Sequence, residues 1–199
     1  MSLPRVYPIV DSAGWIARLA PLGVRLVQLR IKDRPRDEVR AAVRASRALC
    51  AAAAMQLIVN DYWDIALEEG CDFVHLGQGD LAGADLPALR RAAVRLGIST
   101  HDESELERAL AARPAYVALG PIYPTLLKAM PWEPQGLARL TEWKQRIGRL
   151  PLVAIGGLTL ERLAGVFAAG ADVAAVVTDI VRNANPELRT RAWLSAAAA

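Results

Sequence analysis

The stretch "LIVNDYWDIALEEGCDFVHLG", residues 57–77, contains a complete strand, helix and strand. The apolar, β-branched runs at 57–61 and 73–77 are typical of buried strands, whereas the spacing of apolar residues across Trp63 to Glu69 predicts a helix. Strands joined by a helix through short connections form a right-handed βαβ unit with parallel strands. The stretch therefore predicts a parallel sheet that is covered by helices.

The same alternation of short apolar runs and helical segments continues along the whole chain. Further strands are expected at 6–10, 25–31, 97–100, 116–120, 152–157 and 173–180, and further helices at Glu38 to Ala54, Pro87 to Leu96, Glu103 to Ala111, Leu137 to Ile147, Leu160 to Ala169 and Pro186 to Ala197. Eight repeats of roughly 25 residues account for the 199 residues, near the lower end of the size of a (β/α)8 barrel. We predict an α/β protein with a single TIM-barrel domain over residues 1–199, and an open doubly wound sheet is the alternative.

Glycines agree with this division of the chain. Gly23, Gly70, Gly97 and Gly170 each lie between a helical segment and a strand. A left-handed helix C-cap is needed at such positions, and glycine adopts it without steric cost. We therefore expect all four to end helices.

The composition limits the class of partner. Hydrophobic residues make up 53% of the chain, and the net charge of +3 is dispersed, which argues against nucleic acid and suits an anionic small molecule. No apolar stretch approaches the roughly 18 residues that span a bilayer, so no membrane contact is expected. Cys50 and Cys71 form no C-x-x-C pair and are expected to be buried, reduced thiols of a cytoplasmic protein. A homodimer is possible, because the composition does not determine the oligomeric state.

In a TIM barrel the chemistry lies at the carboxyl ends of the strands. The second expected strand ends in "QLRIKD", which places Gln28, Arg30 and Lys32 on one face of the strand. Two cations and an amide on one face are suited to phosphate oxygens. Solvent-facing strand ends are the alternative interpretation.

The third and fourth strands end in acidic residues. Asn60 and Asp61 lie at the end of one strand, and His75, Gln78 and Asp80 lie at the end of the next. Two carboxylates from neighbouring strands form an oxygen-rich pocket that is suited to Mg²⁺, which takes one or two carboxylates together with water and phosphate. Each aspartate could instead cap the helix that follows it.

The fifth strand ends with Ser99 and His101. A histidine at this position could act as a general base, although a satisfied structural histidine is the more common case.

The sixth strand is followed by the long loop 121–135, in which Thr125 and Lys128 are suited to holding an anion. A long loop within a compact domain is usually functional or disordered, and the apolar content of this one argues against disorder. We expect it to act as a lid that excludes water.

The last two strands carry a glycine pair and a threonine. Gly156 and Gly157 precede a helix, and Thr178 ends the next strand. Backbone N–H groups at this place form the usual phosphate site of a TIM barrel.

Six motifs at the strand ends together resemble the thiamine phosphate synthase family. In chain order they are "VQLRIKD", "LIVNDYWDIALEEGCDFVHLGQGDL", "GISTHDESE", "YVALGPIYPTLLK", "PLVAIGGL" and "AGADVAAVVTDI". The resemblance implies a TIM barrel and a transferase of thiamine biosynthesis that uses Mg²⁺. Such an enzyme joins 4-amino-5-hydroxymethyl-2-methylpyrimidine diphosphate to hydroxyethylthiazole phosphate and releases pyrophosphate.

The resemblance also implies a role for individual residues. The pyrimidine diphosphate would be held by Gln28, Arg30, Lys32, Asn60, Ser99 and Lys128, the metal by Asp61 and Asp80, and the thiazole phosphate by Thr125, Gly156, Gly157, Val177 and Thr178. Catalysis would depend on Arg30, Lys32, Ser99 and Lys128, because the departing diphosphate needs positive charge and the pyrimidine needs orientation.

The chain departs from the family pattern at five positions. Ile31 replaces an acid, and we expect it to point away from the site. Tyr62 stands where an arginine is common, Leu127 removes a hydroxyl from the loop, and Thr178 replaces a serine. Asp179 adds a negative charge that must either point away from a bound phosphate or weaken its binding.

Two other functions compete with the synthase. A thiazole tautomerase, a relative within the family, would use His101 for proton transfer and needs no metal. A non-catalytic barrel that binds a phosphorylated ligand is the second, and the departures at Tyr62 and Leu127 would fit it. The two aspartates and the lysines at 32 and 128 favour the synthase, since a tautomerase has no use for a diphosphate clamp.

Overall fold

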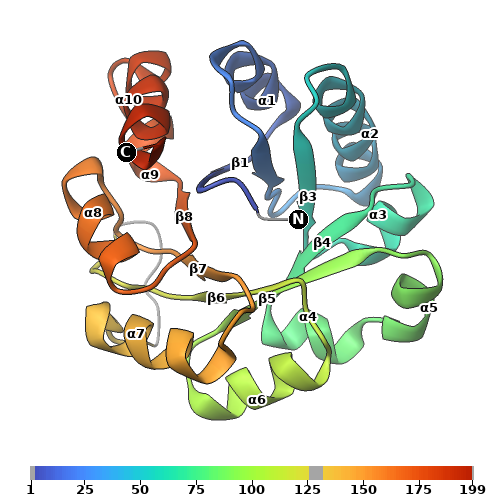
Figure 1. Ribbon diagram of the computed structural model, residues 1–199. Coiled ribbons are helices and arrows are strands. Elements are labelled where there is room, and N and C mark those ends of the chain that lie inside the picture. Colours follow the sequence, from blue (N-terminus) through green and yellow to red (C-terminus); the bar gives the residue numbers. More distant parts are fainter. Residues whose placement is uncertain (1–2, 126–131, 199) are drawn as a thin grey trace.

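The computed structural model describes residues 3–125 and 132–198 of the chain. Eight parallel strands close into a barrel in which each strand pairs with its neighbours in the sequence and the last pairs with the first. Figure 1 looks along this barrel and shows the helices arranged around the strands. The predicted α/β class and the TIM barrel are confirmed, and the open doubly wound sheet is wrong.

The strands and helices alternate along the chain. The strands are β1 Val6–Val10, β2 Leu26–Leu29, β3 Gln56–Asn60, β4 Phe73–Leu76, β5 Arg95–Thr100, β6 Tyr116–Leu119, β7 Leu152–Ala154 and β8 Val173–Val176. The α-helices are α1 Ala13–Leu19, α2 Arg36–Ala52, α3 Trp63–Glu68, α4 Gln78–Gly83, α5 Leu86–Arg91, α6 Glu103–Ala111, α7 Gly136–Ile147, α8 Leu160–Ala168, α9 Thr178–Val181 and α10 Pro186–Ala198. A 3-10 turn, η1, covers Ala20–Leu22.

Strand residues point alternately to two separate apolar cores. Residues such as Ile9, Leu26 and Ile58 fill the barrel interior. Residues such as Val27 and Val59 pack between the sheet and the surrounding helices. This alternation determines which side chains at the strand ends can face the barrel mouth.

The structure corrects two expectations about the elements. The run 173–180 is not one strand, because β8 ends at Val176, where its pairing with Pro8 of β1 also ends, and the polar residues after it start α9. Gly97 is not a helix cap, since it lies inside β5. The other three glycines do have left-handed backbones, with φ values of 92° at Gly23, 68° at Gly70 and 103° at Gly170.

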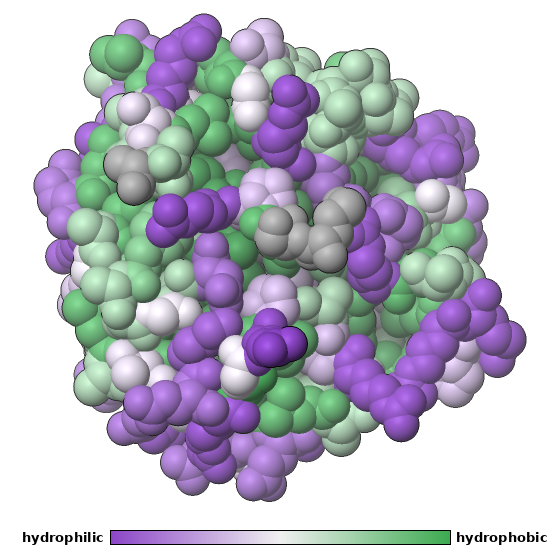
Figure 2. Space-filling model, in the orientation of Figure 1, coloured by the Kyte–Doolittle hydropathy of each residue, from purple (hydrophilic) through white to green (hydrophobic). Residues whose placement is uncertain are grey.

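Both cysteines are buried free thiols, as expected. Burial raises the pKa of both Cys50 and Cys71 to about 11, so they stay protonated at neutral pH. Figure 2 shows hydrophilic side chains around the edge of the face that Figure 1 presents. Among the described residues, no helix is both long and apolar enough to cross a membrane.

Candidate active site

A cavity of about 690 Å³ opens at the carboxyl ends of the strands. Every predicted site residue that lies within the described part of the chain lines it: Gln28, Arg30, Lys32, Asn60, Asp61, Asp80, Ser99, Thr125, Gly156, Gly157, Val177 and Thr178. Lys128 lies outside the described residues. The parallel strands bring these residues together because all their carboxyl ends lie at the same end of the barrel.

One side of the cavity, next to β2, β3 and β4, carries the charges. Lys32 forms an ion pair with Asp61, which has a left-handed backbone φ of 64° and donates its N–H to the carbonyl of His75 at 2.9 Å. Asp80 lies in the first turn of α4 and is close enough to Asp61 for their carboxyl groups to interact. Neither aspartate is at the N-cap position of the helix that follows it, since Tyr62 occupies that position in α3 and Gly77 occupies it in α4.

The electrostatics of this carboxylate pair fit a divalent cation. Partial burial and the negative charge of Asp61 raise the pKa of Asp80 above its ordinary value. Two carboxylates that repel each other across a cavity are relieved by a cation between them. Within the described ranges, no cluster of three or more His, Cys, Asp or Glu side chains exists. A two-carboxylate set suits Mg²⁺, which keeps water and phosphate ligands, better than a metal that needs a full cage of protein ligands.

The opposite side of the cavity, next to β7 and β8, offers backbone groups. Gly156 and Gly157 both have left-handed φ values, 97° and 63°. The N–H groups of Gly157, Leu158, Val177 and Thr178 donate to no backbone carbonyl in the described part of the chain. Successive N–H groups of this kind form a concave site that favours an anion.

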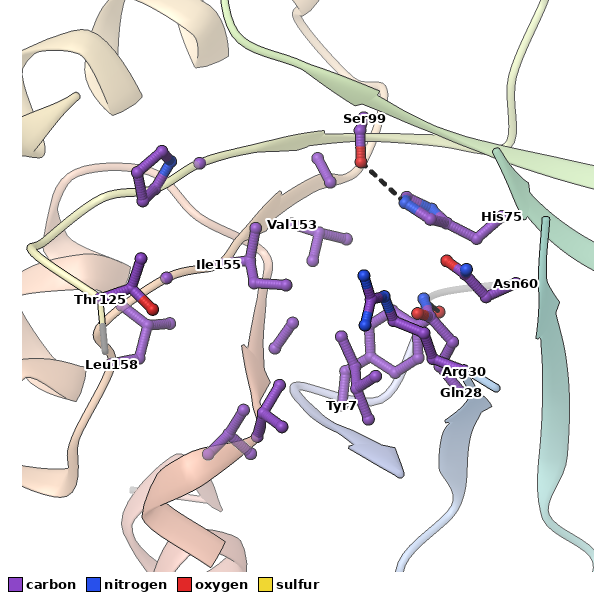
Figure 3. Close-up of a pocket in the computed structure, with 18 of the residues that line it drawn as sticks. Tyr7, Gln28, Arg30, Asn60, His75, Ser99, Thr125, Val153, Ile155 and Leu158 are labelled. Carbon is purple, nitrogen blue, oxygen red and sulfur yellow. Dashed lines mark hydrogen bonds between the residues drawn. The ribbon is translucent and has the colours of Figure 1, made fainter. Parts of the chain in front are cut away.

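The middle of the cavity is apolar. Figure 3 shows Val153 and Ile155 between the polar group around Arg30 and the side that carries Thr125. Ala118 also lines this part. An apolar centre with one charged side and one backbone side suits a ligand pair with an anionic group at each end.

Comparison with known proteins finds matches to one family over nearly the whole length of the chain. The family model described as thiamine monophosphate synthase matches residues 6–180. The thiamine-phosphate synthase of Rhizobium etli is 64% identical over 198 residues, which cover 100% of this chain and 97% of that protein. The chain belongs to the thiamine monophosphate synthase family. A second relative, the thiamine-phosphate synthase of Klebsiella pneumoniae, is 48% identical over 194 residues, covering 98% of this chain and 92% of that protein.

A solved structure of similar fold is the thiamine phosphate pyrophosphorylase from Pyrococcus furiosus. It superposes with a TM-score of 0.86 at 23% identity and covers 98% of this chain and 96% of that one. At that identity the likeness supports the barrel fold alone. The assignment to the thiamine monophosphate synthase family rests on the sequence matches.

The structure accounts for two of the departures from the family pattern. Ile31 is buried in the core outside the barrel, away from the cavity, as expected. The Asp179 carboxylate turns away from the cavity and accepts two hydrogen bonds from Arg189, at 2.8 and 2.9 Å, and one from Trp193 Nε1 at 2.6 Å. A negative charge held in this way does not oppose an anion at the backbone side. Tyr62 caps α3 and does not line the cavity, while Leu127 lies outside the described residues.

The two described ends of the loop 121–135 are tied together. Ile122 N–H donates to Ile155 O at 2.9 Å, and Gly136 N–H donates back to Ile122 O at 3.0 Å. A Cβ on Gly157 would lie 2.5 Å from the carbonyl oxygen of Pro124, so only glycine allows this approach of the two loops. The central residues, on which the predicted lid depends, lie outside the described part.

His101 has protein partners. Its Nδ1 is 2.7 Å from Glu105 Oε2, which also accepts the His101 backbone N–H, and its ring stacks on Trp132 with a centroid distance of 5.1 Å. The ring nevertheless lines the cavity. The geometry therefore fits an oriented structural histidine and leaves a role for it untested.

Sequence reasoning missed a polar chain on the floor of the cavity. Gln28 Nε2 is 2.8 Å from Tyr7 Oη, which is 3.0 Å from Tyr116 Oη. The Tyr116 hydroxyl is 2.8 Å from His75 Nδ1, and His75 Nε2 is 2.8 Å from Ser99 Oγ. Figure 3 shows the last of these bonds. These bonds connect Gln28 and Ser99, two residues predicted to hold the pyrimidine, through two tyrosines that were not predicted and through His75, which was placed at a strand end without a role.

Burial keeps the three linking groups neutral. It raises the pKa of Tyr7 and of Tyr116 above the usual value for a phenol. It lowers the pKa of His75 to about 4, an effect that the nearby Asp61 charge only partly offsets. The signal in the sequence was weak, since a tyrosine within an apolar strand usually belongs to the core.

Proposed function

We propose that this chain is a thiamine phosphate synthase, a transferase of thiamine biosynthesis. It joins 4-amino-5-hydroxymethyl-2-methylpyrimidine diphosphate to hydroxyethylthiazole phosphate and forms thiamine phosphate and pyrophosphate. One observation carries this proposal: a single cavity has cations and paired carboxylates on one side and, on the other, backbone N–H groups that donate to no backbone carbonyl among the described residues. Such a cavity matches two phosphorylated substrates that meet over an apolar centre. Family membership supports the same reaction.

The charged side takes the pyrimidine diphosphate. Arg30 and Lys32 lie beside the cavity, and Lys128 is expected to join them from the loop. Asp61 and Asp80 would hold Mg²⁺, which would supply further positive charge to the diphosphate. Arg30, Lys32 and Lys128 stabilise the negative charge that develops as the diphosphate departs.

The backbone side takes the thiazole phosphate. Thr125 and Thr178 bring hydroxyl groups to this side, and the N–H groups near Gly157 and Val177 complete an anion site. Gly156, with its left-handed backbone, shapes the turn that leads into the site. An anion site formed by backbone groups cannot move with side-chain rotamers, so it holds the thiazole in a fixed place.

The reaction itself exchanges one bond for another. The bond between the pyrimidine methylene carbon and the diphosphate oxygen breaks, and its electron pair leaves with the diphosphate. The methylene is then cation-like, because the electron-rich aminopyrimidine shares the charge, and the thiazole nitrogen supplies the electron pair of the new carbon–nitrogen bond. Ser99, Gln28 and Asn60 orient the ring. The apolar centre of the cavity keeps water from capturing the cation.

A coupled assay tests this proposal. Purified protein is supplied with both substrates, with and without Mg²⁺, and pyrophosphate and thiamine phosphate are followed together. We expect equal amounts of both products, only when Mg²⁺ is present. Turnover that is unchanged by a chelator would contradict the metal assignment, and absence of both products from folded protein would contradict the synthase. The assay also separates the tautomerase alternative, which needs neither the metal nor the diphosphate.

The cytoplasmic location and the open question of a homodimer stay predictions. Large hydrophobic side chains that are exposed in the described part of the chain are limited to Leu110 and Leu188. Small-molecule substrates are the only partners that the cavity supports directly.

A further inference from the structure

With the Gln28 amide placed so that Nε2 faces Tyr7, the hydrogen-bonded chain from Gln28 to Ser99 runs in one direction. Gln28 Nε2 can only donate, so the Tyr7 oxygen accepts and the Tyr7 hydrogen goes to the Tyr116 oxygen. The Tyr116 hydrogen is then directed at His75 Nδ1, which must carry a lone pair. His75 therefore has its proton on Nε2 and donates it to Ser99 Oγ.

The direction of the chain determines what its two ends offer to a ligand. Ser99 Oγ accepts from His75, which leaves its own hydrogen to be donated into the cavity. The Gln28 amide is locked because Nε2 bonds to Tyr7, so Oε1, which bonds to no protein group in the described ranges, is left as an acceptor. The chain thus fixes a donor at one place and an acceptor at another.

We infer that Tyr7, Tyr116 and His75 are positioning residues that orient Ser99 as a donor and Gln28 as an acceptor toward the aminopyrimidine. This inference rests on the proposed function and deepens it. An aminopyrimidine carries an amino group that donates and ring nitrogens that accept, so it complements this pair. A pyrimidine with oxygen in place of the amino group would place an acceptor against Gln28 Oε1. With the chain running in this direction the amide does not present Nε2 to it, so we expect such a ligand to bind more weakly, because a buried polar group would stay unpaired.

The packing of the barrel floor holds the chain in place. Tyr7 and Tyr116 are 1% and 0% exposed, and their rings meet edge to face with centroids 6.1 Å apart. His75 stacks on the Tyr116 ring at a centroid distance of 5.6 Å. Gly97 makes room for Tyr116, since a Cβ at this position would lie 2.1 Å from Tyr116 Cζ. The absence of a side chain at this position of β5 therefore lets the Tyr116 phenol extend across the floor of the cavity.

The first test measures the histidine tautomer directly. The protein has two histidines, so ¹⁵N spectra of the ring nitrogens contain two sets of signals. The variant His101→Gln assigns each set to its residue. We expect His75 in the free protein at neutral pH to carry its proton on Nε2. In Tyr116→Phe, Nδ1 loses its donor, and we expect a mixture of tautomers. A wild-type His75 with its proton on Nδ1 would overturn the inference, because the chain would then run the other way.

The second test is a double-mutant cycle on binding of the pyrimidine diphosphate, measured by calorimetry. Tyr116→Phe and Ser99→Ala should each weaken binding about tenfold, the scale of one lost hydrogen bond. If Tyr116 acts by orienting Ser99, its effect should largely vanish in the Ser99→Ala background. Tyr62→Phe makes the same chemical change outside the chain and should leave the dissociation constant unchanged.

Fully additive losses would show that Tyr116 acts only through packing, and would overturn the inference. A folded wild-type protein that does not bind the diphosphate would refute the proposed function and with it the assignment of the ligand. The tautomer measurement would then still decide the direction of the chain. The two failures are therefore distinguishable.

Discussion

The two sides of the cavity offer different physical means of binding an anion. Next to β2, β3 and β4 the groups are charged side chains, with Lys32 paired to Asp61 and Asp80 nearby. Next to β7 and β8 they are backbone N–H groups around Gly157, and the carboxylate of Asp179 in that region is paired with Arg189. Charge can be tuned by protonation or by a metal, whereas backbone geometry is fixed by the fold. The two sides should therefore respond differently to substitution.

The largest effect is expected on the charged side. Asp80→Asn removes a proposed metal ligand and should lower turnover roughly 10²- to 10³-fold, the scale of losing one preorganised electrostatic contact. Because the change also relieves repulsion with Asp61, the melting temperature measured without metal should stay level or rise. Steady-state kinetics and thermal unfolding on the same sample check both parts.

Asp64→Asn is a matched control for this substitution. Asp64 is paired with Arg36 on the outside of the barrel and does not line the cavity. Its turnover should equal that of the wild type. If Asp80→Asn lowered the melting temperature enough to explain its loss of turnover by unfolding, the carboxylate pair would be structural.

On the backbone side, substitution of Asp179 should have the opposite result: a loss of stability with little effect on substrate binding. Asp179→Ala leaves Arg189 and Trp193 without their shared partner, and should cost about 3 kcal/mol of stability. The Michaelis constant for the thiazole phosphate should change little, since Asp179 faces away from the cavity. Urea unfolding and kinetics at a temperature where the variant is folded measure the two effects. A large fall in that Michaelis constant would show that the aspartate repels the phosphate after all.

The glycine cradle should be sensitive to a single methyl group. Gly157→Ala places a Cβ 2.5 Å from Pro124 O at a φ of 63°, and we expect a loss of about 1–3 kcal/mol of stability. The same methyl group displaces the loop that carries Thr125, so the Michaelis constant for the thiazole phosphate should rise more than that for the pyrimidine diphosphate. Gly83→Ala is the control, because a Cβ there has no neighbour within 4 Å. An equal rise in the Michaelis constants of both substrates would show that the two sides of the cavity do not bind separate substrates.

The smallest effect is expected from the hydroxyl at the start of α9. Thr178→Ser keeps the hydroxyl and should bind thiazole phosphate like the wild type. Thr178→Val removes it and should weaken binding about fivefold, the scale of a neutral hydrogen bond. Titration calorimetry with the thiazole phosphate compares the two. Identical affinities would mean that backbone groups alone hold the phosphate.

The sequence was sufficient for the fold and for the charged side of the cavity. The repeat of short apolar runs and helices predicts the barrel, and the period of two along "QLRIKD" brings Arg30 and Lys32 to its mouth. These features are local, because each depends on one strand and the rule that strand ends converge.

Features that depend on register between strands were not predictable. Tyr7 meets Tyr116 across the barrel over a sequence distance of 109 residues. Nothing in either strand distinguishes such a phenol from an ordinary core residue. The same holds for Gly97. Its role depends on Tyr116, which lies directly opposite it on the neighbouring strand, and the local sequence around Gly97 predicts a helix cap instead.

The close contact between Gly97 and Tyr116 has an evolutionary consequence. With a Cβ at 97 lying 2.1 Å from the phenol ring, position 97 cannot gain a side chain without moving the floor of the cavity. A side chain at 97 would require a much smaller residue at 116, and the link between His75 and Tyr7 would then be lost. Glycine at 97 should therefore be inherited wherever an aromatic ring stands at 116, and only a lineage that loses the ring is free to gain a side chain at 97.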